Sequence, residues 1–249
     1  ADCQTWNTSP RMFGFTQGIV YWTGVAVNPG TLDDKDIAVY ADAGGAGPIL
    51  ASSTGTVGTD FVVGDFNHNL TGTYYSRISY GAAAASYVTE WDSGSDTIFP
   101  GMDATGSVGG GSGGCGLIQV SDIYLNEGQQ VRFLLLTGGS ADIRMCLFRN
   151  PSEGTYWAGR GWAEFEAGNA DGRTYTAPVS DWYGVVVFNN SPGSPAGSYT
   201  LRVRDLPAAL ADTECVLSST VPQLFSLTQA TNYWSAVAIN PSGADDKDV

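Results

Sequence analysis

The chain has 249 residues, and its 43% hydrophobic and 12% aromatic content is enough to fill cores, which excludes a disordered protein. Its net charge of −14 argues against nucleic acid and anionic membrane surfaces as partners, because neutralising phosphate groups requires clustered Lys and Arg. No window of about 18 apolar residues is present, so we expect no membrane insertion.

The first region, 1–92, contains short apolar runs bounded by Gly, Pro and Asn. Such runs, roughly five to nine residues long, are typical of strands in antiparallel sheets. We expect strands at Gly18–Val27, Asp36–Tyr40, Phe61–Gly64, Thr73–Tyr80 and Ser86–Trp91.

Residues 93–114 are expected to form a Gly/Ser-rich linker. Their second half, Gly106–Gly114, has no apolar periodicity, which predicts a flexible segment.

The second region, 115–206, has the same alternation of apolar runs and turns. Three of its segments parallel the first region: Ala141–Cys146 resembles Lys35–Tyr40, and the closing runs at 181–183 and 198–200 resemble those at 73–75 and 86–88. The sequence therefore predicts an all-β protein of tandem antiparallel β-sandwiches, jelly-roll or immunoglobulin-like. Its strands are expected at Ile118–Leu125, Gln130–Leu136, Ala141–Phe148, Trp182–Asn189 and Ser198–Val203.

Residues 211–249 are expected to be an incomplete third repeat, equivalent to the start of the first. The run from Tyr233 to Pro241 repeats the run from Tyr21 to Pro29 at a constant offset of 212, and the only two lysines, Lys35 and Lys247, match at that offset. A partial sandwich exposes an apolar sheet face, so we expect more of the chain or a neighbouring copy to cover it.

The second region resembles a known family through its strand and turn segments Asp122–Leu125, Glu127–Val131, Ala141–Ile143 and Gly197–Leu201. These segments are similar to bacterial pre-peptidase C-terminal domains, which are small secreted β-sandwiches found beside exported enzymes and in surface proteins. The resemblance implies a non-catalytic module, in some members assisted by calcium, and carries no catalytic residue to this chain.

The four cysteines fit no zinc pattern, because no C-x-x-C is present and the chain has one histidine. Disulfides are therefore expected, which implies an extracellular or cell-surface protein. We expect a Cys115–Cys146 bridge within the second region. Cys3 is then left to pair with Cys215, with another chain, or with a cysteine outside this sequence.

Metal binding is the strongest chemical candidate in the sequence. Asp33, Asp34 and Asp36 follow an Asn-Pro-Gly turn, and close carboxylates repel one another unless a cation such as Ca²⁺ lies between them. The alternative is a solvated turn in which Lys35 offsets these charges. The cluster recurs as Asp245, Asp246 and Asp248.

Other chemistry is poorly supported. The G-x-S-x-G match at 110–114 lies in a glycine tract rather than on a strand-to-helix turn, so no serine hydrolase is expected. Glu164 and Glu166 are expected on the charged face of an edge strand rather than in a glycosidase cleft. Aromatic residues of the second region, Trp157 and Trp162 above all, are candidates for stacking on a polysaccharide, although core packing is the alternative.

The sequence thus predicts a non-enzymatic, extracellular structural or adhesive repeat protein that forms filaments with copies of itself, joined head to tail or by strand complementation. The alternative is a polysaccharide- or protein-binding accessory region of an exported enzyme.

Overall fold

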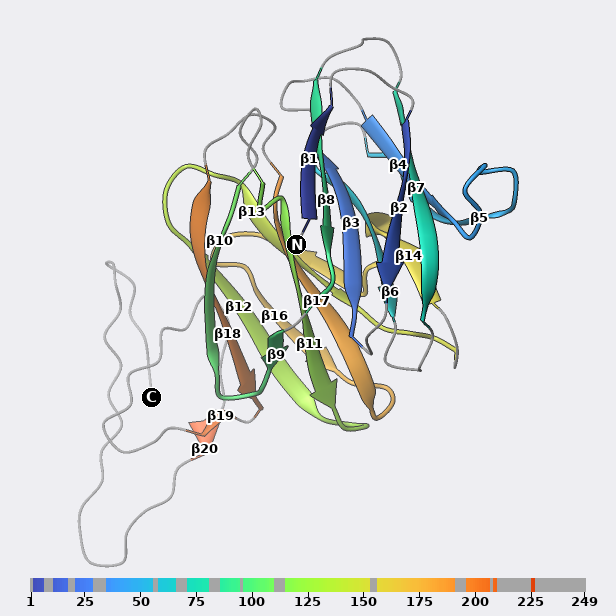
Figure 1. Ribbon diagram of the computed structural model, residues 1–249. Coiled ribbons are helices and arrows are strands. Elements are labelled where there is room, and N and C mark those ends of the chain that lie inside the picture. The colour runs from blue at the N-terminus through green and yellow to red at the C-terminus, as the bar shows by residue number, and fades with distance from the viewer. Residues whose placement is uncertain are drawn as a thin grey trace, which may run out of the picture. The chain divides into compact units, whose positions relative to one another are not determined.

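The computed structural model is almost entirely β in the part of the chain that it describes (Figure 1). Described are residues 2–6, 11–17, 21–28, 35–55, 58–65, 71–80, 86–94, 96–109, 115–152, 156–190, 196–206, 208–209 and 225–226. The chain divides into two compact units, Ala1–Asp205 and Leu206–Val249. No helix of the described residues combines the length and the hydropathy needed to cross a bilayer.

The first sandwich consists of two sheets, which we call A and B. Sheet A has the strand order β1-β8-β3-β6-β14, and sheet B has the order β2-β7-β4-β5. The strands are β1 (Asp2–Trp6), β2 (Arg11–Gln17), β3 (Thr23–Asn28), β4 (Lys35–Tyr40), β5 (Ile49–Ser53), β6 (Asp60–Asp65), β7 (Gly72–Tyr80), β8 (Tyr87–Asp92) and β14 (Tyr156–Gly159).

The second sandwich consists of sheets C and D, with the orders β15-β13-β17-β11-β9 and β10-β18-β12-β16. A single 3₁₀ turn, η1 (Arg160–Trp162), precedes β15. The strands are β9 (Asp96–Ile98), β10 (Asp103–Val108), β11 (Ile118–Leu125), β12 (Gln130–Thr137), β13 (Ile143–Phe148), β15 (Phe165–Ala167), β16 (Gly172–Thr176), β17 (Asp181–Asn189) and β18 (Gly197–Asp205). In the unit Leu206–Val249, β19 (Ala208–Ala209) pairs in parallel with β20 (Phe225–Ser226).

The two sandwiches share one strand topology. The order β10-β18-β12-β16 of sheet D follows the order β1-β8-β3-β6 of sheet A, and β11-β17-β13-β15 of sheet C follows β2-β7-β4-β5 of sheet B. The three strand pairs that look alike in the sequence, β4 with β13, β7 with β17 and β8 with β18, hold corresponding places. Only β9 and β14 lie outside this common pattern.

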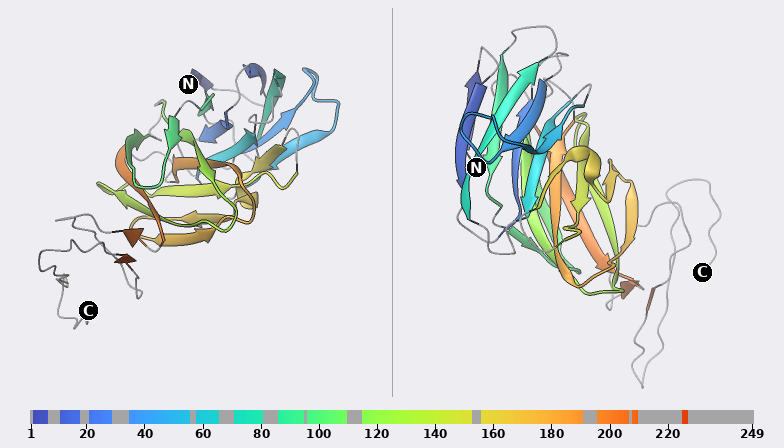
Figure 2. Two further views of the ribbon diagram at one scale, coloured as in Figure 1. Left: turned by 90° about the horizontal axis from the view of Figure 1, so that it is seen from below. Right: turned by 90° about the vertical axis from the view of Figure 1, so that its right-hand side faces the viewer.

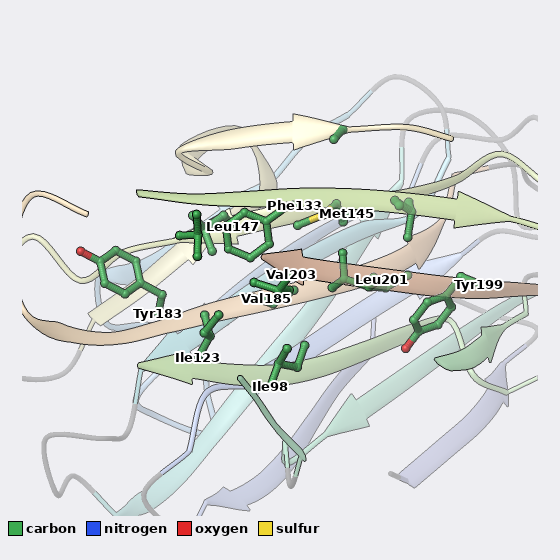
Figure 3. Close-up of a cluster of buried hydrophobic side chains, with 14 of the residues drawn as sticks. Ile98, Ile123, Phe133, Met145, Leu147, Tyr183, Val185, Tyr199, Leu201 and Val203 are labelled. Atoms are coloured by element: carbon green, nitrogen blue, oxygen red, sulfur yellow. The ribbon is translucent and has the colours of Figure 1, made fainter. Parts of the chain in front are cut away.

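The burial of each strand follows from its layer. Strand β18 lies in sheet D, which has sheet C on one face only, so buried and more exposed side chains alternate along it. Tyr199, Leu201 and Val203 point into the core between sheets C and D (Figure 3). Inner strands β3 and β6 are instead buried at every position, because sheet A has sheet B on one face and sheet C on the other. Both views in Figure 2 show the first sandwich, drawn mainly in blue and cyan, lying against the second.

The predicted linker is wrong for residues 96–108. β9 runs parallel to the free edge of β11, and β10 pairs with β18, because their inward side chains Ile98 and Val108 are apolar enough to join the second core. The glycine tract at 110–114 lies outside the described residues. The boundaries 1–92 and 115–206 and the third repeat at 211–249 stay predictions, since Ala1–Asp205 forms one compact unit and most of the last segment is not described.

Candidate functional site

The most elaborate set of contacts in the described residues is the junction where sheet A packs on sheet C. Its apolar core contains Phe61 and Val63 of sheet A and Phe148 and Phe188 of sheet C. The two sheets approach closely at Gly24, where an added Cβ would lie 2.7 Å from Cδ1 of Ile118. A side chain at this position would therefore require Ile118 and Val120 to shift.

Trp22 belongs to the apolar core of the junction and is fully buried. Its ring packs 6.3 Å from Phe148 and 6.2 Å from Tyr156, both contributed by the second region. Its indole N–H donates a hydrogen bond of 3.2 Å to the carbonyl oxygen of Trp182. A Cβ at Gly184 would lie 2.5 Å from the indole ring, so the glycine provides the space for this contact.

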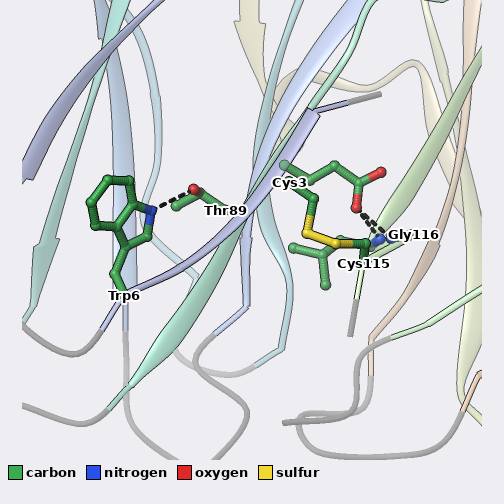
Figure 4. Close-up of a disulfide and its surroundings, with 7 residues drawn as sticks. Cys3, Trp6, Thr89, Cys115 and Gly116 are labelled. Atoms are coloured by element: carbon green, nitrogen blue, oxygen red, sulfur yellow. Dashed lines mark hydrogen bonds between the residues drawn. A yellow bond between two sulfur atoms is a disulfide. The ribbon is translucent and has the colours of Figure 1, made fainter. Parts of the chain in front are cut away.

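A covalent and polar clamp holds β11 where its chain enters sheet C. Cys3 forms a disulfide with Cys115, and its cross-strand neighbour Glu90 accepts hydrogen bonds of 2.6 Å from the backbone N–H groups of Gly116 and Leu117 (Figure 4). Burial raises the pKa of Glu90, and these two hydrogen bonds partly oppose that effect. The clamp thus fixes the second sandwich to sheet A at its first residues.

Two further carboxylates bind backbone N–H groups across the junction. Asp122 Oδ1 accepts from the N–H of Trp22 at 3.0 Å, and Asp92 Oδ2 accepts from the N–H of Val120 at 2.8 Å. These contacts satisfy donors that the packed sheets would otherwise leave without water or partner.

Arg160 joins the two sandwiches at another point of the junction. Its guanidinium donates to the backbone oxygen of Thr59 in the first region at 3.2 Å, and to Asn190 and Glu166 in the second. It also lies 4.5 Å from the centre of the Phe188 ring. The Arg160 guanidinium therefore links the two sandwiches by hydrogen bonds, and the Glu166 carboxylate balances its charge.

Glu164 and Glu166 are both engaged in ion pairs. Glu164 pairs with Arg149 at 3.0 Å, and Glu166 pairs with Arg160 and Arg144 at 2.9 and 2.8 Å. Partial burial acts to raise the pKa of Glu166, but the hydrogen bonds from both arginines outweigh it and the pKa is lowered. A carboxyl group with a lowered pKa is a poor proton donor, which fits the predicted edge strand, here β15, better than a glycosidase acid.

The predicted calcium cluster lies mostly outside the described residues. Asp33, Asp34 and the repeat positions Asp245, Asp246 and Asp248 are not described. Asp36 and Lys35 belong to β4, where Lys35 is buried, so Lys35 is not part of a solvated turn. No set of three or more His, Cys, Asp or Glu side chains in the described ranges is grouped for a metal ion. Calcium binding stays a prediction.

The two predicted saccharide-stacking tryptophans have opposite environments. Trp157 is only 8% exposed and packs between sheets A and B, with its ring 4.9 Å from Tyr74 and 6.0 Å from Phe15, so its assignment to ligand binding is wrong. The reason is that β14 leaves the second region and pairs with β6. Trp162, on η1, is 76% exposed and remains available to a ligand.

The predicted Cys115–Cys146 disulfide is also wrong. Cys115 pairs with Cys3, and Cys146 is a free thiol whose pKa is raised by burial in the junction. Cys146 lies in the middle of sheet C, whereas Cys115 lies before its first long strand. Cys215 is outside the described residues. The Cys3–Cys115 disulfide is compatible with an exported protein, because disulfides persist in oxidising compartments.

The sequence analysis missed the junction as a site. The available signal was the repeat itself: Trp22 recurs as Trp234, and Cys3 recurs as Cys215, both at the offset of 212. Neither residue shows from its local pattern that it contacts a second sandwich.

No protein-family model and no curated protein matches the chain. The solved structures similar to it include the pre-peptidase C-terminal domain of collagenase from Bacillus anthracis, at 16% sequence identity and a TM-score of 0.35, covering 44% of this chain and 93% of that one. Another is Aeromonas hydrophila PliG, a periplasmic lysozyme inhibitor of g-type lysozyme, at 15% identity and a TM-score of 0.30, covering 44% and 96%. A third is a turret protein of Sulfolobus turreted icosahedral virus, at 8% identity and a TM-score of 0.22, covering 82% and 97%.

The first of these similarities agrees with the family resemblance seen in the sequence. At these identities, and with TM-scores below 0.5, the similarities say nothing about the function of this chain.

Proposed function

We propose that this chain is a non-catalytic, exported structural protein in which the double sandwich is the unit of a linear array. The observation that carries the proposal is the match between the repeat and the fold. The compact unit ends at Asp205, and the sequence that opens it begins again at an offset of 212. One repeat period therefore spans both sandwiches rather than one.

The repeated residues support the same unit. Trp22 and Cys3 are two of the residues of the first sandwich that bind the second, through the Trp182 carbonyl and the Cys115 disulfide. The sequence repeats these residues as Trp234 and Cys215, and so provides the same side chains for contact with the second sandwich of a following unit. In such an array each unit is closed internally, and neighbouring units follow one another along the chain.

Electron microscopy of the native material tests the array. Antibodies raised against Ala1–Asp205 should label intact cells, and negative staining of the extracted material should show linear particles with a regular repeat. Isolated single particles, or labelling only after permeabilisation, would contradict the proposal.

A second candidate function is a polysaccharide- or protein-binding accessory region of an exported enzyme. The exposure of Trp162 favours it, because a large aromatic ring on the surface can stack on a sugar face. A pull-down on insoluble polysaccharides tests it: retention that Trp162→Ala abolishes would support this function, and equal retention of both proteins would exclude a role for this ring.

A further inference from the structure

The outer face of sheet D, on the side away from sheet C, carries a shallow trough with a volume of about 600 Å³. This volume lies within the range of small-ligand sites, about 300–1,000 Å³. Gly138 contributes to the open space, because a Cβ there would lie 2.8 Å from the hydroxyl oxygen of Ser198. Side chains from the three adjacent strands β10, β18 and β12 line the trough: Thr105, Ser107, Ser198, Thr200, Leu136 and Thr137.

The side chains of the trough form a regular set of hydroxyl groups. In the register of β10 and β18, Thr105 lies opposite Thr200, and Ser107 lies opposite Ser198. Among the described residues, none of these four hydroxyls is hydrogen-bonded to another protein group. Each hydroxyl can donate one hydrogen bond and accept others, which matches the hydroxyl groups of a sugar.

The lining is uncharged although the chain as a whole carries a net charge of −14. The nearest charge on the same face of β18, Arg202, is paired with Asp103 at 3.1 Å. The overall charge disfavours an acidic ligand, while the trough itself has no group that would attract one. Interfaces between proteins are depleted in Ser and enriched in aromatic residues and Arg, so a hydroxyl-rich surface fits a saccharide better.

The position of the trough within the fold supports a binding role. Sheet D corresponds in topology to sheet A, and β10 and β18 correspond to β1 and β8. In sheet A these two strands bind residues 115–117 of the neighbouring sandwich. In sheet D the described residues of Ala1–Asp205 place no sandwich on that face. We propose that this trough binds a neutral oligosaccharide through paired Thr and Ser hydroxyls. This inference does not depend on the array.

An NMR titration of the ¹⁵N-labelled chain tests the proposal. The probes are neutral oligosaccharides of β-1,4-glucan, β-1,3-glucan and mannan, with oligogalacturonate as the acidic probe. We expect saturable shifts at the amides of Thr105, Ser107 and Gly138 with at least one neutral probe. Replacing both Thr105 and Thr200 by Val keeps the side-chain shape and removes two hydroxyls, which should weaken binding at least about tenfold.

The matched control is the double replacement of Thr174 and Thr176 by Val. These threonines are exposed on β16, in the same sheet but outside the trough, so this variant should bind as the unmodified chain does. Absence of saturable shifts with every neutral probe, binding of the acidic probe alone, or equal weakening by both double variants would overturn the proposal. Shifts at the same amides that depend on protein concentration without saccharide would assign the trough to a second copy instead. Binding lost in Trp162→Ala but kept in the Thr105/Thr200 variant would place the saccharide on η1.

Discussion

Replacing Trp22 by Ala should destabilise both sandwiches together. The side chain is fully buried in the apolar core between them. Large-to-small replacements of buried aromatic residues cost about 3–5 kcal/mol. The lost hydrogen bond to the carbonyl oxygen of Trp182 adds about 1 kcal/mol. We therefore expect the free energy of unfolding to fall by about 4–6 kcal/mol, a large share of what an ordinary domain possesses.

The assay is urea unfolding followed by far-UV circular dichroism, because fluorescence would change with the loss of a tryptophan. Trp162→Ala is the matched control: it removes the same side chain from a position that is 76% exposed, and should change stability by no more than about 0.5 kcal/mol. The unmodified unit should unfold in one transition. The reasoning would be refuted if the two variants were equally stable, or if Trp22→Ala left one sandwich unfolding at the original urea concentration.

Three further outcomes follow from the described contacts and from the predicted cluster. Replacing Cys3 and Cys115 together by Ser should lower the free energy of unfolding by about 2–4 kcal/mol. A reducing agent should destabilise the unmodified chain by the same amount and leave the stability of this variant unchanged. Equal stability of the variant and the unmodified chain without a reducing agent would argue against the disulfide. Burial raises the pKa of Asp60 from 3.8 to about 6, against the hydrogen bonds from Ser53 and Gly55. The folded state therefore favours the protonated carboxyl of Asp60. The stability that this protonation contributes to folding is complete below pH 3.8 and is lost as the pH rises through about 6. Asp60→Asn should accordingly raise stability at pH 7 by up to roughly 3 kcal/mol but not at pH 4, and a gain that is equal at both pH values would contradict the titration. Calcium chloride should raise the Tm of the unmodified chain, with the shift removed by EGTA and by replacing Asp33 and Asp34 by Asn; an unchanged Tm would end the calcium hypothesis.

The sequence was sufficient to find the strands that form sandwich centres. The predicted runs at 36–40, 61–64, 118–125 and 182–189 coincide with β4, β6, β11 and β17, because each combines β-branched or aromatic residues with turn residues at its ends. The sequence analysis missed other strands of the two sandwiches: β1, β2, β5, β9, β10, β14 and β16. They lie at or near sheet edges, where half of the ladder is absent and few apolar residues are needed.

The partners of these strands could not be predicted from local pattern. β14 follows β13 in the chain, yet it pairs with β6 of the first sandwich. The pairing of β14 with β6 depends on the edge of the assembled sheet A. The residues Tyr156–Gly159 alone do not reveal it. The same holds for Cys115, whose partner lies 112 residues away. Two errors of the sequence analysis, the disulfide and the role of Trp157, arise from treating the second region as self-contained.

The junction also explains why the two sandwiches share little sequence beyond their strand order. Sheets A and D hold equivalent places, but sheet A must accept sheet C, which requires Gly24 to be small and Glu90 to face backbone donors. The equivalent face of sheet D carries Arg202 and Arg204, paired with Asp103. Side chains that meet different neighbours are free to diverge, so equivalent strands of the two sandwiches need not keep the same residues. This divergence within Ala1–Asp205 supports the proposal that the double sandwich, and not the single one, is the unit of the array.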